Sequence, residues 1–293
     1  MLRFKNFGFT PILGWSFSRY DRFSECKRSY YYNYYGKYDQ EHSRETIDNL
    51  KDLTSLPMEI GKITHDIISE LLERLKITTD PIDKEKFEKR IRTVIDEKLR
   101  VKRFFEIYYH DENEITLDRI YPKVAISLFN LLNSDRFEWL KEKAIQTKDQ
   151  WLIEPSRFGE SRLGDLKLYC KVDFLIPVDN RVVILEWKTG KKDEKHHRQL
   201  IGYAATAAYH LDKAAEDMEP VLVYLHPEYI EDSIQPNQDD LQTYRETILR
   251  QTQEMYEFCN DHQENIPKDK EVFLMRENDY KCRYCNFREL CDR

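Results

Sequence analysis

Two apolar runs joined by a short turn place the strongest constraint on the fold. Residues 168–176 and 181–185 are almost entirely apolar, and Pro177 closes the first run. Runs of this length with turn residues between them predict two neighbouring β-strands. Each run carries a carboxylate, because Asp173 lies inside the first and Glu186 follows the second directly. We therefore expect the fold to bring two acids to one edge of a sheet.

The order of the remaining elements predicts an α/β core. Besides the two apolar runs, residues 151–154 and 220–225 have the composition of strands. The strand over the first run is expected to begin at residue 166, and the second to extend over 181–188. Helices are expected over 195–213 and 238–263. Strands that alternate with helices in this way build a mixed sheet.

The N-terminal half is expected to be largely helical. Residues 1–60 are rich in aromatic side chains and show no regular pattern, so an irregular segment is predicted there. Apolar residues recur at helical spacing over 61–76, and two more helical stretches are expected over 83–110 and 117–147. We predict one domain over 1–293. Its parts are an N-terminal cysteine segment at 1–60 and a helical lobe at 61–148. A core at 149–226 and a C-terminal helix with the cysteine cluster at 227–293 follow.

Composition limits the classes of function. The 293 residues carry a formal net charge of −7, so any positive charge that binds nucleic acid must be confined to a groove. No apolar run reaches the length of about 18 residues that a membrane span needs, and the first residues do not resemble a signal peptide. We therefore expect a cytoplasmic protein that does not associate with membranes. Its six cysteines are then metal ligands or buried apolar side chains.

The triplet Glu186-Trp187-Lys188 predicts a site for a divalent cation. Residues two apart in a strand share a face, so Glu186 and Lys188 should point the same way. Mg²⁺ and similar hard ions prefer the oxygens that Asp173, Glu186 and the Trp187 carbonyl would supply. Such an ion activates water and offsets phosphodiester charge, and Lys188 would orient the water or neutralise developing charge. The alternative interpretation is two strand-end acids and a solvated lysine.

Three further residues extend this candidate site. Gln199 and Tyr203 are four residues apart on a predicted helix, so they would share a face that can turn toward Lys188 or a DNA backbone. The alternative is an ordinary helix surface with a half-buried tyrosine. His65 lies beside the apolar face of the helix over 61–76. It either projects into the site or has a structural role.

Together these residues resemble the RecB-type branch of the PD-(D/E)XK nucleases. That branch combines a helical G-x-x-x-H motif, an aspartate, E-x-K followed by Thr-Gly, and Q-x-x-x-Y. The matching positions are Gly61, His65, Asp173, Glu186, Lys188, Thr189, Gly190, Gln199 and Tyr203. One departure is Cys170, at a position where the family often has glycine.

The resemblance implies a fold and a chemistry. The fold would be a restriction-endonuclease-like mixed sheet flanked by helices, with an appended helical lobe. The activity would be metal-dependent hydrolysis of phosphodiester bonds in DNA. The residues implied to hold Mg²⁺ or Mn²⁺ are His65, Asp173, Glu186 and Trp187. The catalytic residues are implied to be Asp173, Glu186, Lys188, Gln199 and Tyr203.

Three cysteines near the C-terminus predict a metal centre. They form the pattern C-x2-C-x5-C at Cys282, Cys285 and Cys291. A four-thiolate site needs one more ligand. Cys170 and Cys259 lie in a predicted strand and helix, where buried thiols are common. Cys26 lies in the irregular N-terminal segment and is therefore the better candidate.

A subset of the RecB-type branch resembles this chain in its cysteines as well. Those proteins, which include CRISPR-associated RecB-like nucleases and the AddB nuclease domain, hold a [4Fe–4S] cluster between one N-terminal and three C-terminal cysteines. The resemblance implies the same cluster here, held by Cys26, Cys282, Cys285 and Cys291. The alternatives are Zn²⁺ or no metal at all, because the spacing alone does not decide between them. Residues 77–147 are the part that the resemblance covers poorly.

The leading hypothesis is a metal-dependent DNA nuclease that acts as an exonuclease or processes single strands and ends. Basic residues crowd into the segment 188–198, where they would contact phosphates. The tyrosines of 30–35 would stack on unpaired bases or, for most of these rings, pack in a core. No base-reading module is visible, and no phosphate-binding loop, so a helicase motor would be a separate chain.

Two other functions compete with this one. The first is a DNA-binding or assembly subunit of a helicase–nuclease or CRISPR adaptation complex, in which cleavage is weak or depends on a helicase or integrase partner. The second is a zinc-stabilised protein of unrelated function. The complete set of two acids and a lysine argues against an inactive site.

Overall fold

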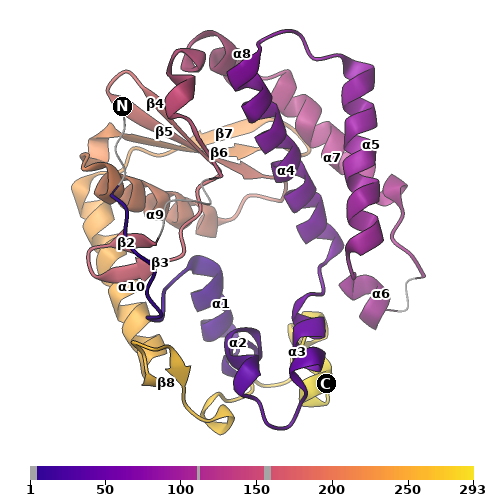
Figure 1. Cartoon of the computed structure of the whole chain (residues 1–293), viewed down its shortest axis with the longest axis vertical. Coiled ribbons are helices and arrows are strands. Elements are labelled where there is room, and N and C mark those ends of the chain that lie inside the picture. The colour runs from indigo at the N-terminus through magenta and orange to yellow at the C-terminus, as the bar shows by residue number, and fades with distance from the viewer. Residues whose placement is uncertain (1–4, 111–112, 155–159) are drawn as a thin grey trace. The chain divides into compact units, whose positions relative to one another are not determined.

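The computed structural model describes residues 5–110, 113–154 and 160–293 (Figure 1). The chain forms two compact units, and each is assembled from separate stretches of sequence. We call the first the sheet unit; it takes the described residues within 1–7, 54–159 and 170–244. We call the second the cysteine unit; it takes those within 8–53, 160–169 and 245–293.

The sheet unit is built on a mixed five-stranded sheet, as expected for an α/β fold. The strand order is β1-β4-β5-β6-β7, and β5 and β6 are parallel while the other neighbours are antiparallel. Helix α9 (Glu194–Leu211) lies between the two parallel strands in the chain and provides their crossover. The strands are β1 (Leu152–Ile153), β4 (Phe174–Val178), β5 (Arg181–Lys188), β6 (Met218–Tyr224) and β7 (Ile230–Ser233).

Strand β5 is continuously apolar from Val182 to Leu185, where both of its faces are buried. Leu185 and Trp187 belong to a core that includes side chains of α4 (Leu56–Ile77). Ile184 belongs to a second core that includes side chains of α9. A strand covered on both faces carries a continuous apolar run instead of an alternating one. The acid that follows this run, Glu186, therefore lies at the end of a fully enclosed strand.

Helices form the rest of the sheet unit (Figure 1). Helix α4 begins at Leu56, earlier than the predicted residue 61. Its buried apolar side chains share one core with those of α5 (Lys84–Val101) and α7 (Leu117–Leu132). The stretches predicted as single helices are divided, because α6 (Phe105–Tyr109) follows α5, and α8 (Asp135–Glu142) follows α7. Ser134 starts α8 by accepting a hydrogen bond from the Phe137 N–H at 3.2 Å. No helix in the described part of the chain is long and apolar enough to cross a membrane.

The cysteine unit corrects the prediction of an irregular N-terminal segment. It contains α1 (Phe17–Glu25), α2 (Lys27–Tyr35) and α3 (Arg44–Lys51). The side chains of Ser16, Cys26 and Ser43 cap these three helices, and these signals explain where the helices begin. Core packing is confirmed for most rings of the tyrosine cluster. The buried ones are Tyr30, Tyr31, Tyr32 and Tyr35.

The strand predicted over 166–176 is in fact two strands. Residues 166–168 form β3 (Leu166–Leu168), which pairs with β2 (Ser161–Leu163) in the cysteine unit. Asp173 immediately precedes β4. Pro177 does not end the strand but pairs with Val182 inside it. A proline is tolerated there because the register of β1 on β4 covers only Phe174 and Leu175, so Pro177 lies beyond that pairing.

The C-terminal helix is shorter than predicted. Helix α10 (Gln238–Tyr256) ends before Cys259, which begins the short strand β8 (Cys259–Asp261), paired with β9 (Ile266–Pro267). The prediction of a helical Cys259 was therefore wrong. The prediction of a strand at Cys170 was also wrong, because this residue lies between β3 and β4.

Truncation of the buried strand should destabilise the fold that carries the site. Leu185 is fully buried, so Leu185→Ala leaves a cavity and should lower the free energy of unfolding by about 2–5 kcal/mol. Arg181→Ala, on the same strand with a side chain 60% exposed, should change it by less than about 0.5 kcal/mol. Urea unfolding measures both, and equal effects would contradict the burial described for β5.

Candidate active site

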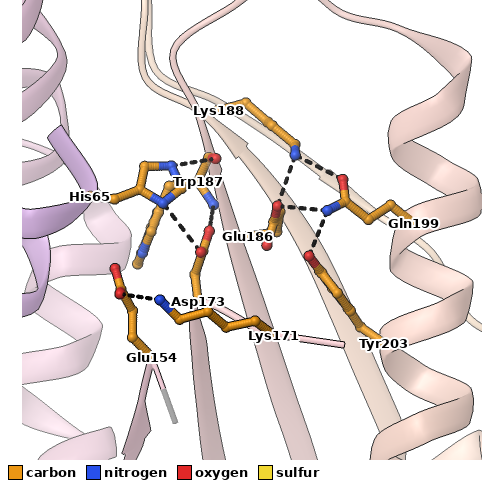
Figure 2. Close-up of polar contacts among 9 residues, drawn as sticks. All are labelled: His65, Glu154, Lys171, Asp173, Glu186, Trp187, Lys188, Gln199 and Tyr203. Carbon is orange, nitrogen blue, oxygen red and sulfur yellow. Dashed lines mark hydrogen bonds and ion pairs between the residues drawn. The ribbon is translucent and has the colours of Figure 1, made fainter. Parts of the chain in front are cut away.

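All seven residues singled out from the sequence lie together in the sheet unit (Figure 2). His65 comes from α4, and Asp173 from the residue before β4. The end of β5 carries Glu186, the Trp187 carbonyl and Lys188 of the E-x-K motif. Helix α9 carries Gln199 and Tyr203.

Asp173 connects α4 to the end of β5. Its Oδ2 accepts a hydrogen bond from the Trp187 N–H at 2.9 Å, and its Oδ1 lies 3.2 Å from Nδ1 of His65. The other ring nitrogen, Nε2, lies 3.0 Å from the Trp187 carbonyl oxygen. Both ring nitrogens thus face acceptors, which favours the charged imidazolium. Burial by itself lowers the pKa of His65 and raises that of Asp173. The hydrogen bond and the charge attraction between the two outweigh burial, so the pKa of His65 is raised and that of Asp173 is lowered.

Lys188 is held between Glu186 and Gln199. Its ammonium donates to Glu186 Oε1 and to Gln199 Oε1, each at 2.8 Å. Gln199 Nε2 donates in turn to Glu186 Oε1 at 3.2 Å and to the Tyr203 hydroxyl at 2.5 Å. Gln199 and Tyr203 therefore share the helix face that turns toward Lys188, as their spacing predicted.

Glu186 is buried next to a second acid, and this surrounding disfavours its charged form. Its burial and the neighbouring charge of Asp173 raise its pKa to about 8, although Lys188 acts in the opposite direction. Its Oε2 is buried and accepts no hydrogen bond from the described residues. A buried carboxylate oxygen without a donor needs another electropositive partner. Asp173, Glu186 and the Trp187 carbonyl offer the oxygen ligands that a divalent cation prefers.

The structure also places Glu154 and Lys171 here, two residues that the sequence reasoning missed. Glu154 offers a ligand atom together with His65 and Asp173, and these three atoms lie within 4.8 Å of one another. The Glu154 N–H donates to the Asp173 carbonyl at 2.8 Å, and its carboxylate pairs with Lys171 at 2.7 Å. The acid that ends the predicted strand 151–154 was the available signal.

Four of the six cysteines line a single cavity in the cysteine unit. The cavity has a volume of about 390 Å³, and Cys26 contributes to it from the junction of α1 and α2. The other three are those of the C-terminal pattern, Cys282, Cys285 and Cys291. Cys259 lies outside this lining, with its sulfur 3.7 Å from the Tyr35 hydroxyl, and Cys170 belongs to the sheet unit.

The cavity is lined by more basic than acidic side chains. Its acidic lining residues are Asp21 and Glu25. Its basic lining residues are Arg22, Arg276, Lys281, Arg288 and Arg293. Arg293 Nη1 lies 3.6 Å from the sulfur of Cys282. Burial raises the pKa of the Cys285 thiol and raises that of Cys291 to about 11, although nearby arginines act in the opposite direction.

The basic segment next to the site is partly committed to other contacts. His196 Nδ1 lies 2.9 Å from the Tyr224 hydroxyl, and His197 Nε2 lies 3.0 Å from Asp232. Lys191 and Lys192 are exposed before α9 begins. Exposed lysines are therefore available close to Lys188.

The mixed sheet flanked by helices is consistent with a restriction-endonuclease-like fold, and one end of it carries two carboxylates, a carbonyl and a tethered lysine. The chain belongs to the PD-(D/E)XK nuclease superfamily, whose family model matches residues 14–292. This membership implies metal-dependent nuclease activity, and nucleases of the superfamily use Mg²⁺ or Mn²⁺.

Other comparisons add little. No curated protein matches the chain. Among solved structures, the crystal structure of SSO0001 is similar at 18% sequence identity and a TM-score of 0.29. That similarity covers 64% of this chain and 78% of the other.

Removal of the Gln199 amide should release Lys188. Gln199→Leu removes an acceptor from the ammonium and a donor from Glu186, so we expect nuclease activity to fall about 10- to 100-fold. Binding of Mn²⁺ should change much less, because Asp173 and Glu186 remain. Gln146→Leu, at an exposed position of the same unit, is the control. Equal cleavage by the two variants of a labelled oligonucleotide would contradict a positioning role for Gln199.

Proposed function

We propose that the protein is a metal-dependent deoxyribonuclease that cuts single-stranded DNA or processes DNA ends. The observation that carries this proposal is the buried, unpartnered oxygen of Glu186 beside Asp173 and the Trp187 carbonyl, with Lys188 tethered next to it. Burial of this group in its charged form is unfavourable unless a proton or a cation neutralises it.

In the proposed site, His65, Asp173, Glu186 and the Trp187 carbonyl hold Mg²⁺ or Mn²⁺. The bound ion supplies an activated water and offsets the charge of the phosphodiester. Lys188, with a side chain 18% exposed, can reach solvent while its ammonium stays fixed. It orients the attacking water and balances the negative charge that develops on the phosphate. Gln199 and Tyr203 keep that ammonium in place.

The surroundings of the site support a DNA substrate. Lys191, Lys192 and Arg198 are exposed near the start of α9, next to the end of β5. Such a cluster contacts the phosphate backbone without reading bases. Cleavage is therefore expected to depend little on sequence and strongly on salt concentration.

In the cysteine unit, we propose that the four thiols of the cavity hold a [4Fe–4S] cluster. A tetrahedral zinc site with Zn–S bonds of 2.3 Å brings its sulfurs to about 3.8 Å from one another. No three cysteine sulfurs among the described residues lie within 4.8 Å of one another. A cluster, which binds each sulfur to a different iron, suits this wider spacing better. Free thiols of this kind persist in the cytoplasm, where we place the protein.

A second candidate function is that of a subunit whose cleavage depends on a helicase or integrase partner. Large apolar and aromatic side chains that are exposed in the cysteine unit favour this second function. Leu274, Tyr280 and Tyr284 are 69%, 67% and 70% exposed. Exposed apolar and aromatic side chains gathered in one segment often mark an interaction surface.

Substitutions at the site should separate binding from catalysis. Asp173→Asn should lose Mn²⁺ binding and cleavage together, whereas Lys188→Met should keep Mn²⁺ binding and lose cleavage by about 10²-fold or more. Lys141→Met, which removes an exposed ion pair with Glu138, is the matched control. Digestion of labelled single-stranded DNA with Mn²⁺ measures all three. Equal activity of Lys188→Met and the control would contradict the proposed function.

Loss of the cysteine-bound metal should unfold part of the protein. Cys285→Ser should lose the metal and lower the melting temperature by about 10 °C, since metal binding contributes to folding free energy. Cys170→Ser, outside the cavity, should retain the metal. Anaerobically purified wild type should absorb near 400 nm and contain about four irons per chain. Colourless protein with stoichiometric zinc would overturn the cluster but not the nuclease.

A further inference from the structure

Two side chains at the start of α9 meet at the ring of Tyr224. Nδ1 of His196 lies 2.9 Å from the Tyr224 hydroxyl. The ammonium of Lys192 lies 5.4 Å from the centre of the Tyr224 ring. Tyr224 is buried at the end of β6, so both groups are anchored on an element of the sheet. None of these three residues belongs to the motifs recognised in the sequence.

The Tyr224 hydroxyl fixes which ring nitrogen of His196 carries a proton. Nδ1 is the only acceptor that the described residues offer to this hydroxyl, and a buried hydroxyl rarely leaves its proton unpaired. Tyr224 therefore donates to Nδ1, and the neutral imidazole carries its own proton on Nε2. No described residue accepts a hydrogen bond from Nε2, and His196 is only half-buried. The Nε2–H is therefore available to a ligand.

The electrostatic surroundings keep His196 neutral. Burial lowers its pKa below the ordinary value, and the nearby charge of Lys188 lowers it further. Asp193 acts in the opposite direction, but its carboxylate accepts the Lys195 N–H at 2.8 Å at the start of the helix. His196 thus supplies a donor without charge. Lys192, which is exposed and forms no ion pair with the described residues, supplies a positive charge beside it.

Both donors lie one strand away from Lys188. Tyr224 is the partner of Lys188 in the register of the parallel strands β5 and β6. The next residue, Leu225, continues this contact, because its N–H donates to the Lys188 carbonyl at 2.8 Å. Neighbouring strands of a sheet are about 4.8 Å apart. A DNA strand with one phosphate at Lys188 can therefore bring a neighbouring phosphate to Lys192 and His196.

We propose that Lys192 and His196, held on Tyr224, form a binding subsite for a phosphate next to the one that is cleaved. The subsite rests on the proposed function, because it takes DNA as the substrate. Lys192 attracts the phosphate by its charge, and the His196 Nε2–H donates to a non-bridging oxygen. Tyr224 is a positioning residue, because it fixes the proton on Nε2. Such a subsite sets the register of the strand without reading its bases.

Salt dependence distinguishes the two donors. A lysine that binds a phosphate of single-stranded DNA releases a counterion, so Lys192→Met should weaken binding. It should also reduce the slope of log affinity against log salt concentration by about 0.7. His196→Ala should weaken binding about three- to tenfold with the slope unchanged, since a neutral donor displaces no counterion. Tyr224→Phe should weaken binding in the same way, because the proton is no longer fixed on Nε2.

Fluorescence anisotropy of a labelled single-stranded oligonucleotide measures these affinities over a range of NaCl concentrations. No divalent cation is added, so the DNA stays intact, and thermal melting verifies the folding of each variant. His196→Gln, whose amide can place a donor near the position of Nε2, should recover most of the affinity. His197→Ala is the matched control, because Nε2 of His197 is already paired with Asp232 at 3.0 Å. It should bind within about twofold of wild type.

The outcomes separate this inference from the proposed function. Equal affinity of His196→Ala and wild type would overturn the subsite. A slope reduced in His196→Ala as much as in Lys192→Met would show that His196 binds as a cation, and would overturn the neutral donor. Both results would leave the nuclease standing, because cleavage by wild type with Mn²⁺ tests it independently. Absence of that cleavage, with the expected binding pattern, would overturn the nuclease and keep Lys192 and His196 as a DNA contact.

Discussion

The hydrogen bond from the Trp187 N–H to Asp173 is the interaction on which the active site depends. It ties the residue before β4 to the end of β5, two elements that pair as antiparallel neighbours. The same carboxylate also meets His65, so it joins α4 to the same point of the sheet edge. The Trp187 carbonyl on the other side of that peptide faces His65 as well. One peptide unit thus organises the donors that the proposed metal would use.

The site gathers charge in a place where charge is costly. Glu186 is almost fully buried, and its pKa of about 8 reflects that burial and the nearby Asp173. Lys188 compensates only part of this cost, because one carboxylate oxygen remains without a donor. A bound cation would relieve the repulsion between the two acids. The apolar strand that carries Glu186 resists distortion, since it is enclosed on both faces and cannot relax toward water.

The sequence predicted some elements well and others poorly, for identifiable reasons. The bounds of β5 agree with the predicted 181–188, because an apolar run between turn residues has few other interpretations. The three N-terminal helices were missed, because the dense aromatic residues concealed the capping signals of Ser16, Cys26 and Ser43. The run over 166–176 predicts a single strand, because apolar composition does not reveal that its two ends belong to different units.

The sequence by itself determined the chemical types at the site. An acid inside one apolar run, an E-x-K triplet after the next, and a helical Q-x-x-x-Y were readable because each depends on spacing of a few residues along one element. Only the tertiary structure decided that Glu154 and Lys171 join them. It also placed Cys26, which the sequence had singled out, in one cavity with three cysteines more than 250 residues away. Those contacts link segments that are distant in the chain, and burial and strand pairing, which act through space, bring them together.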